Sequence, residues 1–342
     1  MTRNNLTASI TRRRLCAATA LLPAAVAFAP KARAAEFNYK LGLELRDDQP
    51  LPRRMTEACK AILAESGGRL EIRPFPNAQL GSSQEMLTQV RQGSLEMVTT
   101  SFGLLSSVIP TAGLPTLGFI FDGYDKIWSA IDGDLGSFIG AEIKKRGELQ
   151  VIAPVLDLGF RQLTSNKRPI LEPKDLKGFR VRTPQTPFLT SLWSALGAAP
   201  TPLPFPDLYT ALQTGLVDGQ ENPLTLVESF RFYEVQKHCT LTRHTWDGWL
   251  PVANTRAWER LPVDLRNIVS SNFHKAALLQ RKDVEAQNAA VQIALAGKGM
   301  QFHPASSAFR DALRGTDFYS QWKAKLGDAA WAALERSVGK LV

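Results

Sequence analysis

A helix that ends at a glycine and runs into a short strand occurs twice in this chain, at residues 85–99 and 207–220. In the first instance an alternating apolar and charged segment, residues 69–73, precedes the helix and is typical of a half-buried strand. Strand, helix and strand at this spacing predict a parallel sheet flanked by helices. We therefore expect an α/β protein with matching units in two lobes. A single large sheet is the alternative.

Other segments extend this pattern. Ser82 and Glu85 have the spacing of a capping box, which predicts the start of a helix that runs to about residue 91. An apolar stripe of helical period predicts a long helix over 262–297. The remaining expected elements are strands at 37–45, 94–99, 179–182 and 216–220, helices at 53–65, 186–196 and 207–214, and two or three C-terminal helices within 308–341.

The first 34 residues have the composition of an export signal. They hold six basic residues and no acidic one, and a mainly apolar run at 15–29 is followed by Ala32-Arg33-Ala34. This order predicts a cleaved signal peptide over residues 1–34 and a periplasmic location. The segment 11–15, Thr-Arg-Arg-Arg-Leu, is similar to a twin-arginine export motif. An ordinary Sec signal with an arginine-rich start is the alternative.

The net charge of the whole chain is +9, which by itself would favour a nucleic-acid partner. Without the six basic residues of the leader, 35 basic residues face 32 acidic ones, and the net charge falls to +3. The remaining Lys and Arg are scattered, so we expect no nucleic-acid partner. No run of about 18 apolar residues is present, which excludes a polytopic membrane protein.

Motifs that carry enzyme chemistry are missing from the sequence. It has no Gly-x-Ser-x-Gly elbow, no phosphate-binding glycine loop, no His-Glu-x-x-His and no Cys-x-x-Cys. His238 and His244 lie six residues apart without an acidic cluster, so we expect no metal site, no cofactor and no catalytic residue. These observations favour a binding protein. Cys59 and Cys239 are expected to be buried apolar side chains, although export would permit a bridge.

Arg182 is the strongest candidate for a ligand contact. It ends the predicted strand 179–182, and open α/β sheets bind ligands at the carboxyl ends of their strands. The planar guanidinium offers two parallel donors that match the two oxygens of a carboxylate. The alternative is a structural ion pair with a nearby acid such as Asp175.

Three further segments supply candidate side chains. Residues 159–166 are interpreted as a polar loop that carries Arg161, and Glu221 and Asn222 follow the predicted strand 216–220. Trp246 and Trp249 could stack on a ligand. Core packing is the commoner fate of a tryptophan.

Several runs together resemble the solute receptors of tripartite ATP-independent periplasmic (TRAP) transporters, over nearly the whole chain after the leader. They are Asp-Leu-Lys-Gly-Phe-Arg-Val-Arg at 175–182, Pro-Leu-Pro-Phe at 202–205, Tyr-x-Ala-Leu-Gln-x-Gly-x-Val-Asp-Gly-Gln-Glu-Asn-Pro at 209–223, and Gly-Arg-Leu-Glu-Ile-x-x-Phe-Pro-Asn-Ala-Gln-Leu-Gly at 68–81.

The resemblance implies a two-lobed periplasmic binding protein fold with a long helix, here 263–296, that spans both lobes. The first lobe would comprise residues 35–158 plus about 247–287. The second would comprise 159–246 plus about 288–342. By the same resemblance, one arginine grips the ligand carboxylate and a second one assists it. The expected ligand-binding residues are Arg182, Arg161, Asn222, Phe205, Ser101, Thr100, Trp246 and Glu221.

The implied ligand is a small organic acid, and the implied partner is a TRAP permease in the membrane. The segment Thr100-Ser101-Phe102 carries no charge, which argues against an amino-bearing or heavily hydroxylated ligand such as a sialic acid. A monocarboxylate such as a 2-oxo or aromatic acid is expected, and a dicarboxylate held by both arginines is possible. A periplasmic enzyme that acts on organic acids and a receptor for a signalling sensor are the competing interpretations.

Overall fold

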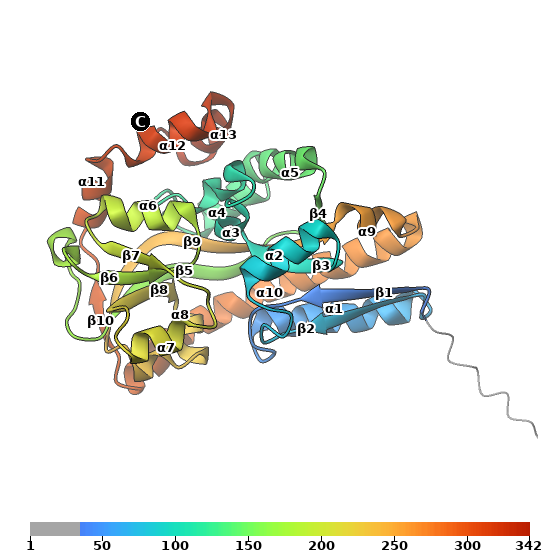
Figure 1. Cartoon of the computed structure of the whole chain (residues 1–342), viewed down its shortest axis with the longest axis horizontal. Coiled ribbons are helices and arrows are strands. Elements are labelled where there is room, and N and C mark those ends of the chain that lie inside the picture. The colour runs from blue at the N-terminus through green and yellow to red at the C-terminus, as the bar shows by residue number, and fades with distance from the viewer. Residues whose placement is uncertain (1–34) are drawn as a thin grey trace, which may run out of the picture. The chain divides into compact units, whose positions relative to one another are not determined.

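The computed structural model describes residues 35–342 (Figure 1). The predicted signal peptide therefore lies outside the described residues. Within the described part, the strands form one ten-stranded mixed sheet in the order β2-β1-β3-β9-β5-β8-β6-β7, and β4 and β10 also pair with β9. The strands are β1 (Phe37–Gly42), β2 (Leu70–Phe75), β3 (Met97–Ser101), β4 (Leu149–Val151), β5 (Leu156–Ser165), β6 (Arg180–Thr183), β7 (Ala199–Pro202), β8 (Gly219–Pro223), β9 (His238–Asn254) and β10 (Gln301–Pro304).

Helices surround this sheet, so the α/β class is confirmed. They are α1 (Pro50–Glu65), α2 (Ser83–Gln92), α3 (Phe102–Leu105), α4 (Tyr124–Ile131), α5 (Asp134–Arg146), α6 (Pro187–Ala195), α7 (Leu208–Gln213), α8 (Leu224–Ser229), α9 (Thr255–Arg260), α10 (Val263–Gly297), α11 (Ala308–Arg314), α12 (Phe318–Leu326) and α13 (Asp328–Val338). No helix among these is long and apolar enough to cross a membrane.

One end of the sheet is the parallel unit predicted from the first helix–glycine–strand pattern. β1 pairs in parallel with β2 and β3. The predicted capping box is present at the start of α2, where the Ser82 side chain accepts from the backbone of Glu85 and the Glu85 side chain accepts from the backbone of Ser82. Gly93 ends the helix with φ = 84°, a left-handed conformation that glycine adopts at little cost. The second end has the same design, since β6 pairs in parallel with β7 and β8.

Two long antiparallel strands join these parallel units. β9 runs for 17 residues and pairs with β3 and with β5, and β5 in turn pairs with β8. The strands of both units therefore belong to one hydrogen-bonded sheet, which continues from the first parallel unit into the second.

The interpretation of residues 159–166 as a polar loop is wrong. All but the last of them lie in β5, and every residue of that strand is buried. A strand buried on both sides shows no alternation of polar and apolar residues. Its polar side chains bond to one another inside the protein, so the segment reads as a loop although it is a central strand.

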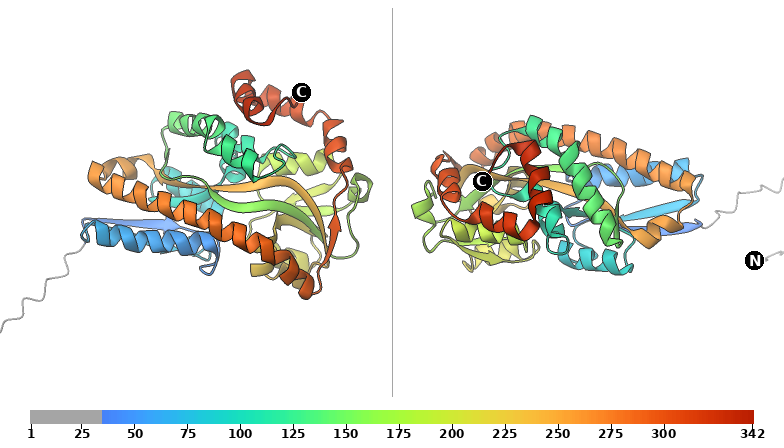
Figure 2. Two further views of the ribbon diagram at one scale, coloured as in Figure 1. Left: turned by 180° about the vertical axis from the view of Figure 1, so that it is seen from behind. Right: turned by 90° about the horizontal axis from the view of Figure 1, so that it is seen from above.

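The predicted long helix is present as α10, which spans 35 residues. It packs against α1, β5 and α8, and the left view of Figure 2, taken from behind, shows it in front of the sheet. The C-terminal segment forms three helices, as expected, of which α13 packs on α4 and α5 and α12 packs on α6. Cys59 and Cys239 are buried free thiols in separate apolar clusters, so the two are not bridged.

Candidate ligand-binding site

Arg182 lies on β6, between β7 and β8, and its side chain is buried. The Nε and Nη2 atoms donate to the carbonyl oxygen of Leu203 at 3.0 and 2.6 Å. Asp175, the acid considered as its partner, instead accepts from the backbone of residues 171 and 172 and lies 3.6 Å from Arg168. Among residues 35–342, no carboxylate lies within 4 Å of the Arg182 guanidinium.

The surroundings of Arg182 oppose its charge. Burial and, to a smaller extent, the nearby Arg161 lower the pKa of Arg182 to about 10, although the more distant charges of Glu221, Glu44 and Asp207 act in the opposite direction. The guanidinium thus stays protonated at neutral pH. A buried charge without a partner costs several kcal/mol, roughly, unless something compensates it. The side chain is therefore prepared for an anion that the protein itself does not supply.

Arg161, on β5, has the opposite environment. Its Nε donates to the carboxylate of Glu221, its Nη1 donates to Asp247, and its Nη2 donates to Asn222 Oδ1 at 2.8 Å. Burial opposes the charge, but Glu221 and Asp247 outweigh it and hold the pKa of Arg161 above its usual range. All three guanidinium nitrogens are used within the protein.

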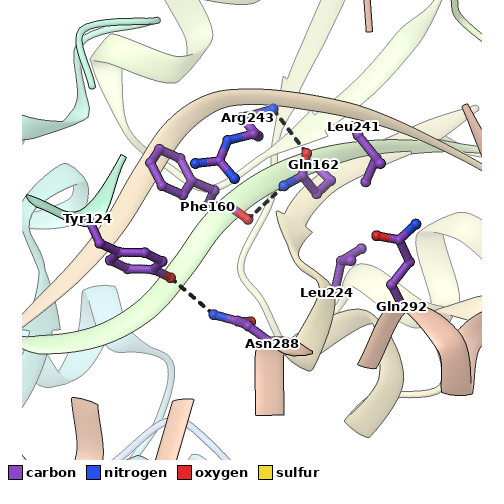
Figure 3. Close-up of a pocket in the computed structure, with 8 residues that line it drawn as sticks. All are labelled: Tyr124, Phe160, Gln162, Leu224, Leu241, Arg243, Asn288 and Gln292. Carbon is purple, nitrogen blue, oxygen red and sulfur yellow. Dashed lines mark hydrogen bonds between the residues drawn. The ribbon is translucent and has the colours of Figure 1, made fainter. Parts of the chain in front are cut away.

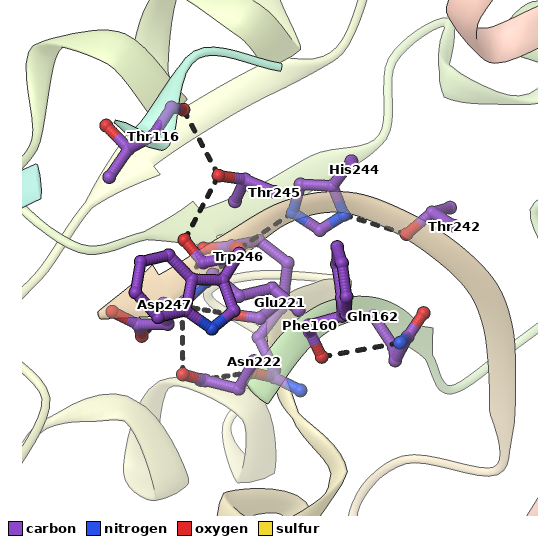
Figure 4. Close-up of polar contacts among 12 residues, drawn as sticks. Thr116, Phe160, Gln162, Glu221, Asn222, Thr242, His244, Thr245, Trp246 and Asp247 are labelled. Atoms are coloured by element: carbon purple, nitrogen blue, oxygen red, sulfur yellow. Dashed lines mark hydrogen bonds and ion pairs between the residues drawn. The ribbon is translucent and has the colours of Figure 1, made fainter. Parts of the chain in front are cut away.

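Glu221 connects this network to His244 (Figure 4). His244 Nε2 lies 2.9 Å from Glu221 Oε2, and His244 Nδ1 lies 2.7 Å from the hydroxyl of Thr242. Burial lowers the pKa of His244, so the imidazole is neutral, with Nε2–H as the donor and Nδ1 as the acceptor. Burial opposes ionisation of Glu221 as well, but Arg161 and His244 lower its pKa overall. From the sequence, His244 was assessed only as a metal ligand, and its hydrogen bond to Glu221 was not predicted.

Asn222 is also held by its neighbours. It accepts from Arg161, and its Nδ2 donates to Gln220 Oε1 at 2.5 Å. Asp247, the second carboxylate on Arg161, accepts from the indole nitrogen of Trp249 at 3.1 Å. Asn222 lies on β8 and Asp247 lies on β9, and the contacts of both side chains are with the protein.

A pocket with about 250 Å³ of empty space, including the part open to solvent, lies against Arg182. Phe205 lines it, with its ring centre 5.7 Å from the Arg182 guanidinium carbon, which is a cation–π distance. Residues of α2 and the segment before it, together with Glu44, form the opposite wall. The pocket is lined by Glu44, Ser82, Ser83, Gln84, Leu104, Arg182, Pro184, Gln185, Leu203, Pro204 and Phe205.

Glu44 is a site residue that the sequence analysis missed. It follows β1, and its Oε1 accepts from the backbone nitrogen of Ser83 at 2.8 Å. Burial raises the pKa of Glu44. The position after the carboxyl end of a parallel strand was the available signal. Glu44 gives the first parallel unit a carboxylate in the pocket, although the segment at residues 100–102 has none.

Trp246 and the two first-unit candidates, Thr100 and Ser101, do not line this pocket. Thr100 is fully buried on β3, and its hydroxyl has no hydrogen-bond partner among the described residues. Ser101 caps α3, where its Oγ accepts from the backbone nitrogen of Leu104 at 3.1 Å. Trp246 packs in an apolar cluster, and its indole nitrogen donates to Asp157 at 2.7 Å. Trp246 therefore packs in the core, which was the alternative to a ligand contact.

No cluster of three or more His, Cys, Asp or Glu residues suited to a metal ion occurs within residues 35–342.

Comparisons with known proteins extend these observations. The model of a family described as bacterial extracellular solute-binding protein, family 7, matches residues 41–319. The protein y4mM of Sinorhizobium fredii is 35% identical over 277 residues, which are 80% of this chain and 50% of that protein. The chain thus spans about half the length of that relative.

Solved structures agree with this match. A TRAP periplasmic solute-binding protein from Polaromonas, bound to D-erythronate, is 30% identical, with a TM-score of 0.82 over 87% of this chain and 98% of that one. Another, from Sulfurospirillum deleyianum with bound succinate, is 28% identical, with a TM-score of 0.82 over 88% and 99%. The two-lobed fold with its long helix is therefore confirmed. The chain belongs to the family 7 extracellular solute-binding proteins, which include the periplasmic receptors of TRAP transporters.

Proposed function

We propose that this chain is a periplasmic receptor that binds a small organic acid anion through its carboxylate on Arg182 and delivers it to a TRAP permease. The buried guanidinium of Arg182, which has no carboxylate partner in the described residues and lines a pocket, is the observation that carries the proposal. A ligand carboxylate would supply the missing charge through two charge-assisted hydrogen bonds.

The charges of the site favour a hydroxylated monocarboxylate within this class. Arg161 is already neutralised by Glu221 and Asp247, so one cation remains for the ligand. Glu44 faces the same pocket and can accept from ligand hydroxyl groups. A second ligand carboxylate would meet Glu44 and be repelled. D-erythronate, the ligand of the Polaromonas protein, combines one carboxylate with several hydroxyls.

In this proposal Arg161 acts indirectly. It holds Glu221 and Asn222 in place, and its charge balances two buried carboxylates beside the pocket. Phe205 would pack against the ligand body, and Thr100, Ser101 and Trp246 would support the wall from behind. These roles differ from direct ligand contacts and can be separated by mutation.

Ligand binding would bring the two lobes together, with lobe boundaries as given from the sequence. Glu44 comes from the first lobe and Arg182 comes from the second, so a ligand that touches both favours the closed state. Closure excludes water and strengthens the charge-assisted bonds. The permease would distinguish the closed form from the open form. Export by the twin-arginine route is part of the same proposal.

The test is a thermal-shift screen of refolded, ligand-free protein against sugar acids, simple monocarboxylates, 2-oxo acids, aromatic acids and dicarboxylates. A ligand at 100 times its Kd adds about 2.7 kcal/mol of stability, enough to raise Tm by several degrees. We expect hydroxylated monocarboxylates to give the largest shift and Arg182→Ala to abolish it. A shift that survives in Arg182→Ala contradicts the proposed contact. Recovery of a chemically altered acid would instead indicate an enzyme.

A further inference from the structure

A second pocket, with about 570 Å³ of empty space, shares no lining residue with the Arg182 pocket (Figure 3). Its walls come from β5, β9 and α10 and from the first residues of α4 and α8. Arg243, on β9, supplies its only full charge, and the other lining side chains are aromatic, aliphatic or amide groups.

The position of Arg243 is set by its neighbours. Its φ of 43° is left-handed, which is uncommon for a residue with a side chain. The backbone nitrogen of Arg243 donates to Gln162 Oε1 at 2.9 Å, which helps to hold this conformation. The guanidinium carbon then lies 3.9 Å from the ring centre of Phe160. Of the hydrogen-bond acceptors in the described residues, only the Asp122 carbonyl oxygen, at 3.4 Å, bonds to this guanidinium.

The surroundings of Asp122 are rich in positive charge. Its carboxylate is bound by Lys126 at 2.7 Å and by Arg310 at 3.1 Å. Three cationic side chains, including Arg243, therefore meet at a residue with one negative charge. Arg243 is therefore the one charged side chain in the lining, and no acidic side chain of the lining opposes the approach of an anion.

The rest of the lining offers an apolar surface that ends in amide groups. Tyr124 and Phe160 pack edge to face with ring centres 5.6 Å apart. Asn288 Nδ2 donates to the Tyr124 hydroxyl at 3.0 Å, which leaves Asn288 Oδ1 available. Gly159 permits this approach, because a Cβ there would lie 3.3 Å from the Asn288 amide, and its φ of 101° is unfavourable for other residues. Gln292, an exposed residue of α10, adds a second amide group to the lining.

We propose that this pocket binds a small aromatic carboxylate. The carboxylate would bond to Arg243, the ring would pack on Tyr124 and on the aliphatic wall formed by Leu224 and Leu241, and a ring hydroxyl would bond to Asn288 or Gln292. The proposal stands independently of the ligand of Arg182, because the two pockets have no residue in common.

The test uses 4-hydroxyphenylacetate as the probe, titrated by calorimetry into the purified chain carrying Arg182→Ala, so that the first pocket cannot take a carboxylate. We expect saturable binding, and a loss of about tenfold or more in affinity when Arg243→Ala is added, since a charge-assisted bond is removed. The neutral 4-hydroxyphenylacetamide should bind more weakly by a similar factor. Arg146→Ala, at an exposed arginine outside the pocket, is the matched control and should leave the affinity unchanged.

A second variant, Leu241→Trp, fills the pocket without touching the charge and should also abolish binding. Thermal unfolding of each variant shows whether it is folded, and amide chemical-shift changes should concentrate at Phe160, Arg243 and Asn288. No saturable binding in the Arg182→Ala chain, or equal affinity with and without Arg243→Ala, overturns the proposal. Neither result bears on the first pocket, which is tested by its own ligands in the wild-type chain.

Discussion

Arg161 and Arg182 are both buried and positively charged, but Arg161 forms ion pairs with two carboxylates and Arg182 with none. Each guanidinium has a different effect on the fold because of this. Arg161 compensates charge that is already buried, whereas Arg182 adds an uncompensated charge and is itself repelled by Arg161. Mutation to an uncharged side chain of similar length should therefore have opposite effects at the two positions.

Arg182→Met should stabilise the ligand-free protein. Removal of an unpaired buried charge should raise the free energy of unfolding by about 1–3 kcal/mol, because the desolvation cost disappears. The same change should abolish binding of the organic acid. Urea unfolding of the refolded protein measures the first effect, and calorimetry measures the second. Arg182→Lys keeps the charge and should show no such stabilisation. A less stable Arg182→Met protein would contradict this account.

Arg161→Met should destabilise the protein with or without ligand. It leaves Glu221 and Asp247 buried without their cation, and breaking a buried ion pair in this way costs about 3–5 kcal/mol. The measurement is urea unfolding beside the Arg182→Met variant under the same conditions. If Arg161→Met unfolds at a higher urea concentration than the wild type, Arg161 is not needed to neutralise Glu221 and Asp247, and its proposed structural role is wrong.

Glu44→Gln should change ligand preference more than stability. The glutamine oxygen can still accept a hydrogen bond from the Ser83 backbone nitrogen. The variant lacks the carboxylate that would accept hydrogen bonds from ligand hydroxyl groups. The ratio of affinities for a hydroxylated over an unsubstituted monocarboxylate should fall about tenfold, since a charge-assisted bond weakens and repulsion of the carboxylate is relieved. Competitive calorimetry gives the ratio. Glu71→Gln, at a half-buried residue outside the pocket, is the control, and an unchanged ratio in Glu44→Gln excludes Glu44 from the ligand site.

Asp157→Asn should remove a pH dependence of stability. Burial raises the pKa of Asp157 to about 6, above the ordinary value of 3.8. The folded state then holds a proton more tightly than the unfolded chain. This tighter proton binding by Asp157 stabilises the folded state by about 3 kcal/mol below about pH 4, and the stabilisation is lost as the pH rises through 6.

An asparagine can still accept from Trp246 and from the backbone of Gly159, as the carboxylate does. Unfolding free energies of the two proteins, measured from pH 4 to pH 7, should therefore diverge, with the variant gaining relative stability as the pH rises. Parallel curves would show that Asp157 does not titrate in this range.

The parts of the fold that depend on local signals were predictable. Ser82 and Glu85 close a capping box between neighbours in sequence, and Gly93 ends the helix by its own conformation. β5 and β9 were not predictable in this way. Arg161 looks like a loop residue until its partners, Glu221 and Asp247, arrive from strands 60 and 86 residues away.

The same limit applies to the site. Arg182 could be singled out because the end of its strand and its own chemistry are visible locally. That its guanidinium lacks a carboxylate, and that Glu44 reaches the same pocket from the far side, depends on long-range packing. Trp246 is the reverse case. Neighbouring aromatic residues in the sequence suggested a ligand contact, but in the folded chain the Trp246 side chain packs in the apolar core.

The long helix α10 has a mechanical consequence for such a receptor. At 1.5 Å per residue, its 35 residues form a rod about 50 Å long. Arg54 on α1 joins it through Asp283 at 2.7 Å, and Lys298 at its end joins Glu228 on α8 at 3.0 Å. Partly exposed ion pairs of this kind contribute little to stability.

The rod itself has no proline and no glycine before its last residue, so it lacks a point where a kink would concentrate. In the proposed receptor, a rotation that separates Glu44 from Arg182 would bend α10 smoothly along its length. The helix would then act as one elastic element, and part of the free energy of ligand binding would go into changing its curvature between the open and closed forms.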